Sequence, residues 1–212
     1  AGIISGLPFS STLTGDDSLK SRPMARIIDP LTLIGASIKA VNSDNLLPLS
    51  VSPSSAIREA AVIETGVASA QVKSAVLLCA LSAGVGVTVK EPLLSRDHTE
   101  RLLTAMGAEF VYPAELSGHS VKLLKREKEL AAIDITVPGD ISTAAPWIIA
   151  ATLHDDAELV LQGVGINPTR TGILDIMQMM GANITIVSEK NVGGEPVADL
   201  LVKSSSFRGV TV

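Results

Sequence analysis

The amino-acid sequence predicts an α/β fold (in the wider sense α+β) made of a repeated β-α-β-α-β-β unit of about 70 residues. The first observation is that a hydroxyl–arginine pair recurs at intervals of 74 residues, as Ser21-Arg22, Ser95-Arg96 and Thr169-Arg170. The second is the apolar segment after each pair, which ends in a Gly-Ala dipeptide beginning at Gly35, Gly107 and Gly181. Glycine just after an apolar helix supplies the left-handed conformation that ends the helix. Each pair is therefore expected to start a helix that ends at glycine and leads into a strand.

The hydrophobic pattern around each pair predicts the remaining elements of the unit. Upstream of the second pair we expect a buried helix at residues 69–83 and a strand at 85–90. Upstream of the third pair we expect a helix at 142–153 and a strand at 158–162, and further strands near 120–125 and 199–203. The helix after the third pair should bury one face, because apolar side chains recur there at helical spacing: Ile173, Ile176, Met177 and Met180.

Composition argues against two classes of partner. The 212 residues include 17 Lys and Arg against 22 Asp and Glu, giving a net charge of −5, and only 2% of them are aromatic. Nucleic-acid binding favours a basic stripe and aromatic stacking platforms, so no nucleic acid is expected as a partner. The uncharged stretch at 74–89 is shorter than the roughly 18 apolar residues of a membrane-spanning helix. No membrane partner is expected either.

Several familiar chemistries lack their residues. His98, His119 and His154 have neither paired spacing nor accompanying carboxylates, so no metal site is predicted. Cys79 is the single cysteine and lies in an apolar segment, which favours a core position over a nucleophile. Gly163-Val164-Gly165 lacks the third glycine of a dinucleotide-binding loop.

The residues do suggest anion binding. Free N–H groups and the helix dipole favour negative charge at a helix start, and arginine adds a bidentate donor, so the three hydroxyl–arginine pairs are candidates. The alternative is that Ser21, Ser95 and Thr169 only cap their helices. Ser69-Ala70-Gln71 is a second candidate, because small residues allow an anion to approach the backbone at the start of the helix that contains Lys73. A purely structural role for this tripeptide is the alternative.

Longer motifs resemble one family. Signatures of 5-enolpyruvylshikimate-3-phosphate (EPSP) synthases, in the right order along essentially the whole chain, are similar to the following segments: Thr14-Gly15-Asp16-Asp17-Ser18-Leu19, Arg22-Pro23-Met24, Ala68-Ser69-Ala70-Gln71-Val72-Lys73-Ser74-Ala75, Ser95-Arg96-Asp97-His98-Thr99-Glu100, Pro138-Gly139-Asp140, Asn167-Pro168-Thr169-Arg170-Thr171-Gly172 and Gly194-Glu195-Pro196-Val197-Ala198-Asp199. Ala70, together with Arg96 and His98, resembles the second class of these enzymes.

The resemblance implies the enolpyruvyl transferase fold, in which each domain has three-fold pseudo-symmetry from three β-α-β-α-β-β units. It implies transfer of the 1-carboxyvinyl group from phosphoenolpyruvate to the 5-hydroxyl of shikimate-3-phosphate, with release of phosphate and no metal or organic cofactor. Such an enzyme belongs to aromatic amino-acid biosynthesis, and the expected setting is the bacterial cytoplasm, with a monomeric full-length enzyme.

The same resemblance assigns residue roles. Ser69, Ala70, Gln71, Ser95 and Arg96 are expected to bind shikimate-3-phosphate, and Arg22 and Gln71 phosphoenolpyruvate. Arg170 occupies the equivalent repeat position and is expected to be structural.

The chain is expected to be an internal fragment. Residues 1–137 would form most of the domain inserted near the start of the enzyme, and residues 138–212 the first unit of the other domain. The family's early Lys-Ser and Arg motif would precede Ala1. Its catalytic Asp would follow Val212, as would later Lys, Glu and Arg residues of the family. No catalytic residue is therefore expected within the chain, and the fragment is expected to be inactive alone.

Two alternatives remain open from the sequence. One is the related transferase that acts on UDP-N-acetylglucosamine, which usually carries a cysteine in the loop just before its Arg-Pro. In this chain the loop before Arg22-Pro23 reads Asp16-Asp17-Ser18-Leu19-Lys20-Ser21, without a cysteine. The other alternative is a truncated, non-catalytic anion-binding module.

Overall fold

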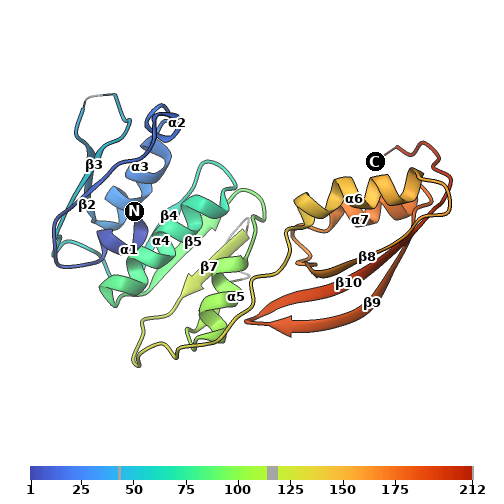
Figure 1. Cartoon of the computed structure of the whole chain (residues 1–212). Helices are drawn as coiled ribbons and strands as arrows, with labels where there is room; N and C mark the ends of the chain where they lie inside the picture. Colours follow the sequence, from blue (N-terminus) through green and yellow to red (C-terminus); the bar gives the residue numbers. More distant parts are fainter. Residues whose placement is uncertain (43, 114–118, 212) are drawn as a thin grey trace. The chain divides into compact units, whose positions relative to one another are not determined.

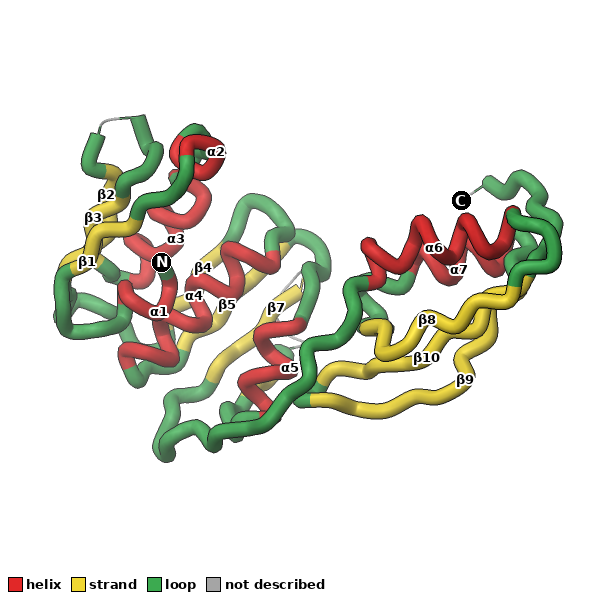
Figure 2. Tube along the Cα trace, viewed as in Figure 1, coloured by secondary structure: helices red, strands yellow, loops and turns green. Residues whose placement is uncertain are grey.

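The computed structural model describes residues 1–42, 44–113 and 119–211 (Figures 1 and 2). Its contacts divide the chain into two compact units, one of residues 1–99 and 107–131 and the other of residues 100–106 and 132–212. We describe each unit by itself. The division at residue 137 into parts of two domains of a longer enzyme stays a prediction.

The second repeat contains the complete predicted unit. Its elements follow the order β-α-β-α-β-β: β4 (Ala61–Glu64), α4 (Ala70–Ala83), β5 (Val87–Glu91), α5 (His98–Ala105), β6 (Phe110–Val111) and β7 (His119–Leu123). The sheet order is β4-β5-β7-β6, and β4 and β5 run parallel, as expected for two strands joined by a crossover helix. The predicted helix at 69–83 and strands at 85–90 and 120–125 are confirmed within two residues.

The first repeat begins in its first helix. Its elements are α1 (Gly2–Ser5), β1 (Ser11–Leu13), α2 (Asp17–Lys20), α3 (Ala25–Ile34), β2 (Ser37–Ala40) and β3 (Leu49–Ser52). Helix α3 ends at Gly35, whose φ of +107° is left-handed, as the sequence predicted.

The third repeat lies in the second unit and has the same plan. Its elements are α6 (Ile141–Leu153), β8 (Glu158–Gly165), α7 (Gly172–Met179), β9 (Asn183–Val192) and β10 (Glu195–Lys203). A single parallel bridge between Gly139 and Val164 stands where β4 pairs with β5 in the second repeat. The predicted order of elements is thus confirmed in the third repeat, where a single parallel bridge takes the place of the first strand.

All three repeats share one sheet order. The last strand lies in the middle and pairs antiparallel with the strand after each helix, giving β1-β3-β2, β5-β7-β6 and β8-β10-β9. This confirms the α/β class and the repeated unit. Neither compact unit of the described chain holds three repeats, so three-fold pseudo-symmetry stays a prediction for a longer protein.

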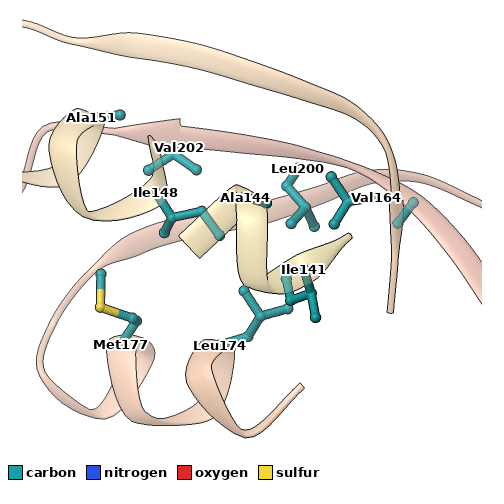
Figure 3. Packing of buried hydrophobic residues seen from close by; sticks show 10 residues of the cluster. Ile141, Ala144, Ile148, Ala151, Val164, Leu174, Met177, Leu200 and Val202 are labelled. Carbon is teal, nitrogen blue, oxygen red and sulfur yellow. The ribbon is translucent and has the colours of Figure 1, made fainter. Parts of the chain in front are cut away.

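The core of the second unit lies between helices and sheet. Figure 1 shows α6 and α7 on the same face of the sheet formed by β8, β10 and β9. Figure 3 shows the side chains between them, among which Ile148, Leu200 and Val202 are fully buried. On α7 the buried residues are Leu174 and Met177, while Ile173, Ile176 and Met180 are half-buried. Helix α7 therefore buries one face, as predicted, but the most buried positions of that face are Leu174 and Met177 rather than Ile173.

Candidate functional site

The start of α4 has the features that an anion needs. Ser69 is the N-cap residue, and among the described residues its side chain makes no capping hydrogen bond. The first N–H groups of a helix have no partner within the helix and carry the positive end of its dipole. The neighbouring Ala70 and Gln71 are half-buried and exposed, respectively, so this helix end is open to a ligand.

A buried carboxylate stands behind this helix start. Glu91 is the last residue of β5 and is 3% exposed. Its Oε1 accepts the Ser69 backbone N–H at 3.0 Å, and its Oε2 accepts the Ser95 hydroxyl at 2.7 Å. One side chain therefore joins the start of α4 to the segment that carries Arg96.

Lys73 balances the charge of Glu91. The Lys73 Nζ lies 3.2 Å from Glu91 Oε2, and the side chains of the two residues are 2% and 3% exposed. The same ammonium donates to the backbone carbonyl of Ser95 at 3.5 Å. Buried charges persist in proteins when they are paired and hydrogen-bonded, and both conditions hold here. Glu91 was not identified from the sequence. The available signal was a Lys and a Glu, Lys73 and Glu91, each in or next to an apolar segment, which suggests a buried ion pair.

An open pocket of about 520 Å³ lies beside the helix start. It brings together three of the predicted site residues, Ala70, Gln71 and Arg96. The hydroxyls of Ser74 and Thr99, which also line it, are hydrogen-bonded to each other at 2.6 Å. Ser69 and Ser95 are not among its lining residues, and Ser95 is only 9% exposed. These two serines are therefore attached to the pocket through Glu91 rather than facing it.

Arg22 lies apart from this pocket in the structure. It is exposed in the turn between α2 and α3 and does not line the pocket. The preceding Ser21 donates its hydroxyl to the carbonyl of Ser18, at the end of α2. The N-cap of α3 is Met24, so the prediction that Ser21 caps this helix is wrong. The dipeptide ends one short helix instead of starting the next.

The other two hydroxyls do not act as caps either. Ser95 donates to Glu91, and the Thr169 hydroxyl donates to the side-chain oxygen of Asn167 at 2.6 Å. Helix α7 begins later, with Thr171 as its N-cap. In each repeat the hydroxyl–arginine pair lies in the turn before the helix, which leaves the arginine side chain free to take different partners.

The three repeat arginines differ in their partners. Arg170 is bound: its Nη2 lies 2.9 Å from Asp140 Oδ1 and donates to the Ser142 hydroxyl at 2.7 Å. It thereby attaches the start of α6 to the turn before α7, which confirms the predicted structural role. Within the described residues, no ion pair is found for Arg22 or Arg96.

Two motifs of the third repeat bind each other. Asn167 donates from Nδ2 to Glu195 Oε2 at 3.0 Å.

Asp199 lies at an irregularity in β10, where its Oδ1 accepts the Gly163 N–H at 2.7 Å and its Oδ2 accepts the Ser188 hydroxyl at 3.1 Å. The hydrogen bond from Gly163, followed by that from Ser188, lowers the pKa of Asp199 below its ordinary value of 3.8. These residues hold the strand connections together.

Metal and thiol chemistry find no support in the part of the chain that the structure describes. No group of three His, Cys, Asp or Glu side chains is arranged to hold a metal ion there. Cys79 is fully buried in α4, and burial raises the pKa of its thiol to about 11, so it is a core residue as predicted. Over the same residues, no helix combines the length and apolar character that crossing a membrane requires.

The repeated units place the chain in a known structural class. The enolpyruvyl transferase NikO from Streptomyces tendae has a similar fold, with a TM-score of 0.58 and 16% identity over 95% of this chain and 45% of NikO. At that identity the similarity shows the fold alone. The chain is thus an α/β protein with the enolpyruvyl transferase fold.

Sequence similarity then gives the family. The model of the EPSP synthase family, 3-phosphoshikimate 1-carboxyvinyltransferase, matches residues 1–212. A 3-phosphoshikimate 1-carboxyvinyltransferase of Pelobacter propionicus is 44% identical over 211 residues, which are 100% of this chain and 47% of that protein. An EPSP synthase from Acinetobacter baumannii has a TM-score of 0.85 and 39% identity over 98% of this chain and 47% of its own. The chain belongs to the EPSP synthase family, and it spans about half the length of these relatives.

Proposed function

We propose that the chain is part of an enzyme that transfers the 1-carboxyvinyl group from phosphoenolpyruvate to the 5-hydroxyl of shikimate-3-phosphate. The 5-hydroxyl loses its proton and its oxygen forms a bond to C2 of phosphoenolpyruvate, while C3 takes a proton and the C2–C3 double bond is used. The bond from C2 to the phosphate oxygen then breaks, C3 loses a proton so that the double bond forms again, and inorganic phosphate leaves. Family membership supports this reaction, and the alternative acceptor UDP-N-acetylglucosamine has no comparable support.

The observation that carries the proposal is the convergence of α4 and Arg96 on one pocket. Gln71 and the small Ala70 lie at a helix start, and Arg96 approaches the same space from the segment before α5. Helix N–H groups, an amide and a guanidinium are the donors that a phosphate dianion prefers. We assign Ser69, Ala70, Gln71, Ser95 and Arg96 to shikimate-3-phosphate, with the two serines at the pocket's margin.

Phosphoenolpyruvate would take its charge partner from Arg22, together with Gln71. Arg22 is an exposed arginine without an ion pair in the described chain, and it lies in the turn before α3. A carboxylate or phosphate could bind its guanidinium through two parallel hydrogen bonds. The assignment of Arg22 to phosphoenolpyruvate rests on the family resemblance of its motif, since Arg22 does not line the pocket in this structure.

The groups assigned to this chain bind and orient charge and do not transfer protons. We therefore expect the 212-residue chain alone to release no phosphate above background from the two substrates. It remains an alternative that the chain is a non-catalytic anion-binding module, since it spans about half the length of its relatives. A gene whose reading frame continues into further β-α-β-α-β-β units would exclude that module, whereas a frame confined to these residues would favour it.

Binding of shikimate-3-phosphate tests the assigned site directly. We expect NMR titration of the ¹⁵N-labelled chain to shift amide signals at Ala70, Gln71 and Arg96. Gln71→Ala should weaken binding about ten-fold, because a hydrogen bond to a charged group is lost. Gln178→Ala, on the exposed side of α7, is the matched control and should bind like the unsubstituted chain. Equal affinities of the two variants would contradict the assignment.

A further inference from the structure

The two segments that are assigned to shikimate-3-phosphate belong to different elements. Ser69, Ala70 and Gln71 form the start of α4, whereas Ser95 and Arg96 lie in the connection from β5 to α5. Each segment ends a strand-to-helix connection, a kind of structure that moves easily unless side chains hold it. Their relative position decides whether Gln71 and Arg96 can bind one phosphate together.

Glu91 is the residue that fixes this position. Its two carboxylate oxygens are divided between the segments: Oε1 takes the Ser69 N–H and Oε2 takes the Ser95 hydroxyl. Lys73, on the first turn of α4, holds Oε2 from the helix side and also reaches the carbonyl of Ser95. The arrangement therefore attaches the Ser95 segment to α4 through three hydrogen bonds and one buried ion pair.

We propose that Glu91, supported by Lys73, is a positioning residue for the phosphate of shikimate-3-phosphate. The proposal rests on the proposed function and adds a residue to it. Glu91 does not line the pocket, so its effect on the ligand passes through Ser69 and Ser95. Groups that are already in place when the ligand arrives bind it more tightly, because less conformational freedom is lost on binding.

The hydrogen bond from Ser95 also determines what this serine offers a ligand. Its hydroxyl has a single hydrogen, which is donated to Glu91, and a phosphate dianion has only acceptors. Ser95 can therefore donate to the phosphate only when its hydroxyl turns away from Glu91. In the arrangement seen here the Ser95 hydroxyl attaches the segment that carries Arg96 to Glu91, while Gln71 and Arg96 line the pocket.

A pair of double variants tests the proposal without leaving a charge buried alone. Both carry Lys73→Met, combined in one with Glu91→Gln and in the other with Glu91→Leu. The glutamine can still accept the Ser69 N–H and can donate to the Ser95 oxygen, whereas the leucine can do neither. The two proteins are similar in core volume and equal in charge, and any other contact of Lys73 is lost from both. They differ in the connection alone.

We expect the glutamine variant to bind shikimate-3-phosphate within about three-fold of the unsubstituted chain, and the leucine variant about ten-fold more weakly or worse. Amide exchange measured without ligand should show the Ser69 N–H exchanging faster in the leucine variant only. The Gly139 N–H, which is bound to Gly163 in the other unit, is the internal control.

The outcomes separate two kinds of failure. Equal binding by the two folded variants, or unchanged exchange of the Ser69 amide in the leucine variant, would overturn the positioning role. If the unsubstituted chain binds no shikimate-3-phosphate, the proposed function fails, and a titration with inorganic phosphate then decides the role of Glu91 by the same comparison. If neither anion binds the unsubstituted chain, the positioning role is overturned as well.

Discussion

Helices α4 and α6 occupy the same place in their repeats, but they are buried to very different extents. Both are apolar over most of their circumference. In α4 most sides are buried, because the helix packs on α1 and α3 as well as on β5, and the remaining stripe, with Gln71, Ser74 and Leu78, lines the pocket. Helix α6 packs on β8 and β10, and its other side leaves Trp147 61% and Leu153 62% exposed.

The difference shows what one β-α-β-α-β-β unit can achieve alone. Its own sheet covers one side of the first helix, and only the helices of a second repeat cover the other side. A helix that is apolar over most of its surface is normally a buried one, so the sequence of α6 is matched to neighbours from outside its own repeat. Repeats of this kind reach full burial by stacking.

The largest expected effect compares matched leucines on the two helices. Leu77→Ala should destabilise the first unit by about 2–5 kcal/mol, because Leu77 is fully buried and its removal leaves a cavity. Leu153→Ala should change the stability of the second unit by less than about 0.5 kcal/mol, because Leu153 already contacts water. Urea unfolding, followed through amide signals of β5 and β10, measures each unit separately. A loss of similar size in both units would break the comparison.

Thiol reactivity sharpens the comparison at a smaller scale. Cys79 should react with a thiol reagent at least roughly 100-fold more slowly than an ordinary cysteine, because burial raises its pKa to about 11 and lowers its thiolate fraction. Combining Ala150→Cys with Cys79→Ala places the single thiol on the exposed side of α6, where it should react at an ordinary rate. If the thiols of the folded unsubstituted chain and of the folded double variant react at comparable rates, α4 is not the better-covered helix.

The smallest expected effect concerns the sheet beneath α6. Because hydrogen bonds lower the folded-state pKa of Asp199, its stabilising contribution is complete above its unfolded pKa and is lost as the pH falls through its folded pKa. We expect Asp199→Asn to lower the melting temperature of the second unit slightly at neutral pH, and to lower it less at a pH well below 3.8. Asp175→Asn, on the exposed face of α7, is the control. If the melting temperature of Asp199→Asn is lower by the same amount at every pH, the loss of stability comes from changed hydrogen-bond geometry and not from the charge of Asp199.

Much of the fold could be predicted because its signals are local. Glycine follows the helix after each hydroxyl–arginine pair, and the spacing of these pairs gives the repeat. The helices expected at 69–83 and 142–153 are predicted almost to the residue. The sheet order could not be predicted, because the pairing of β10 with β8 depends on contacts distant in sequence. Cap roles failed for a similar reason: Ser95 has an alternative acceptor in Glu91, which an isolated dipeptide does not reveal.

The candidate site was predicted only in part. Gln71 and Arg96 line one pocket, and their binding of an anion there stays a prediction. Glu91 was missed because a glutamate at the end of a strand usually faces water, and its burial becomes evident only when α4 brings Lys73 to it. Arg22 is assigned from motif similarity alone, since its position in the turn before α3 brings its side chain to no partner among the described residues.

The middle position of each repeat's last strand has a consequence for synthesis on the ribosome. The sheet of β8, β10 and β9 needs β10 for every one of its antiparallel pairings, and β10 is translated last. Until β10 emerges from the ribosome, β8 and β9 have unpaired edges, and the face of α6 that packs on the sheet has no complete sheet to pack on. Each repeat is therefore a delayed folding event: the nascent chain must keep two strands apart until the third arrives between them.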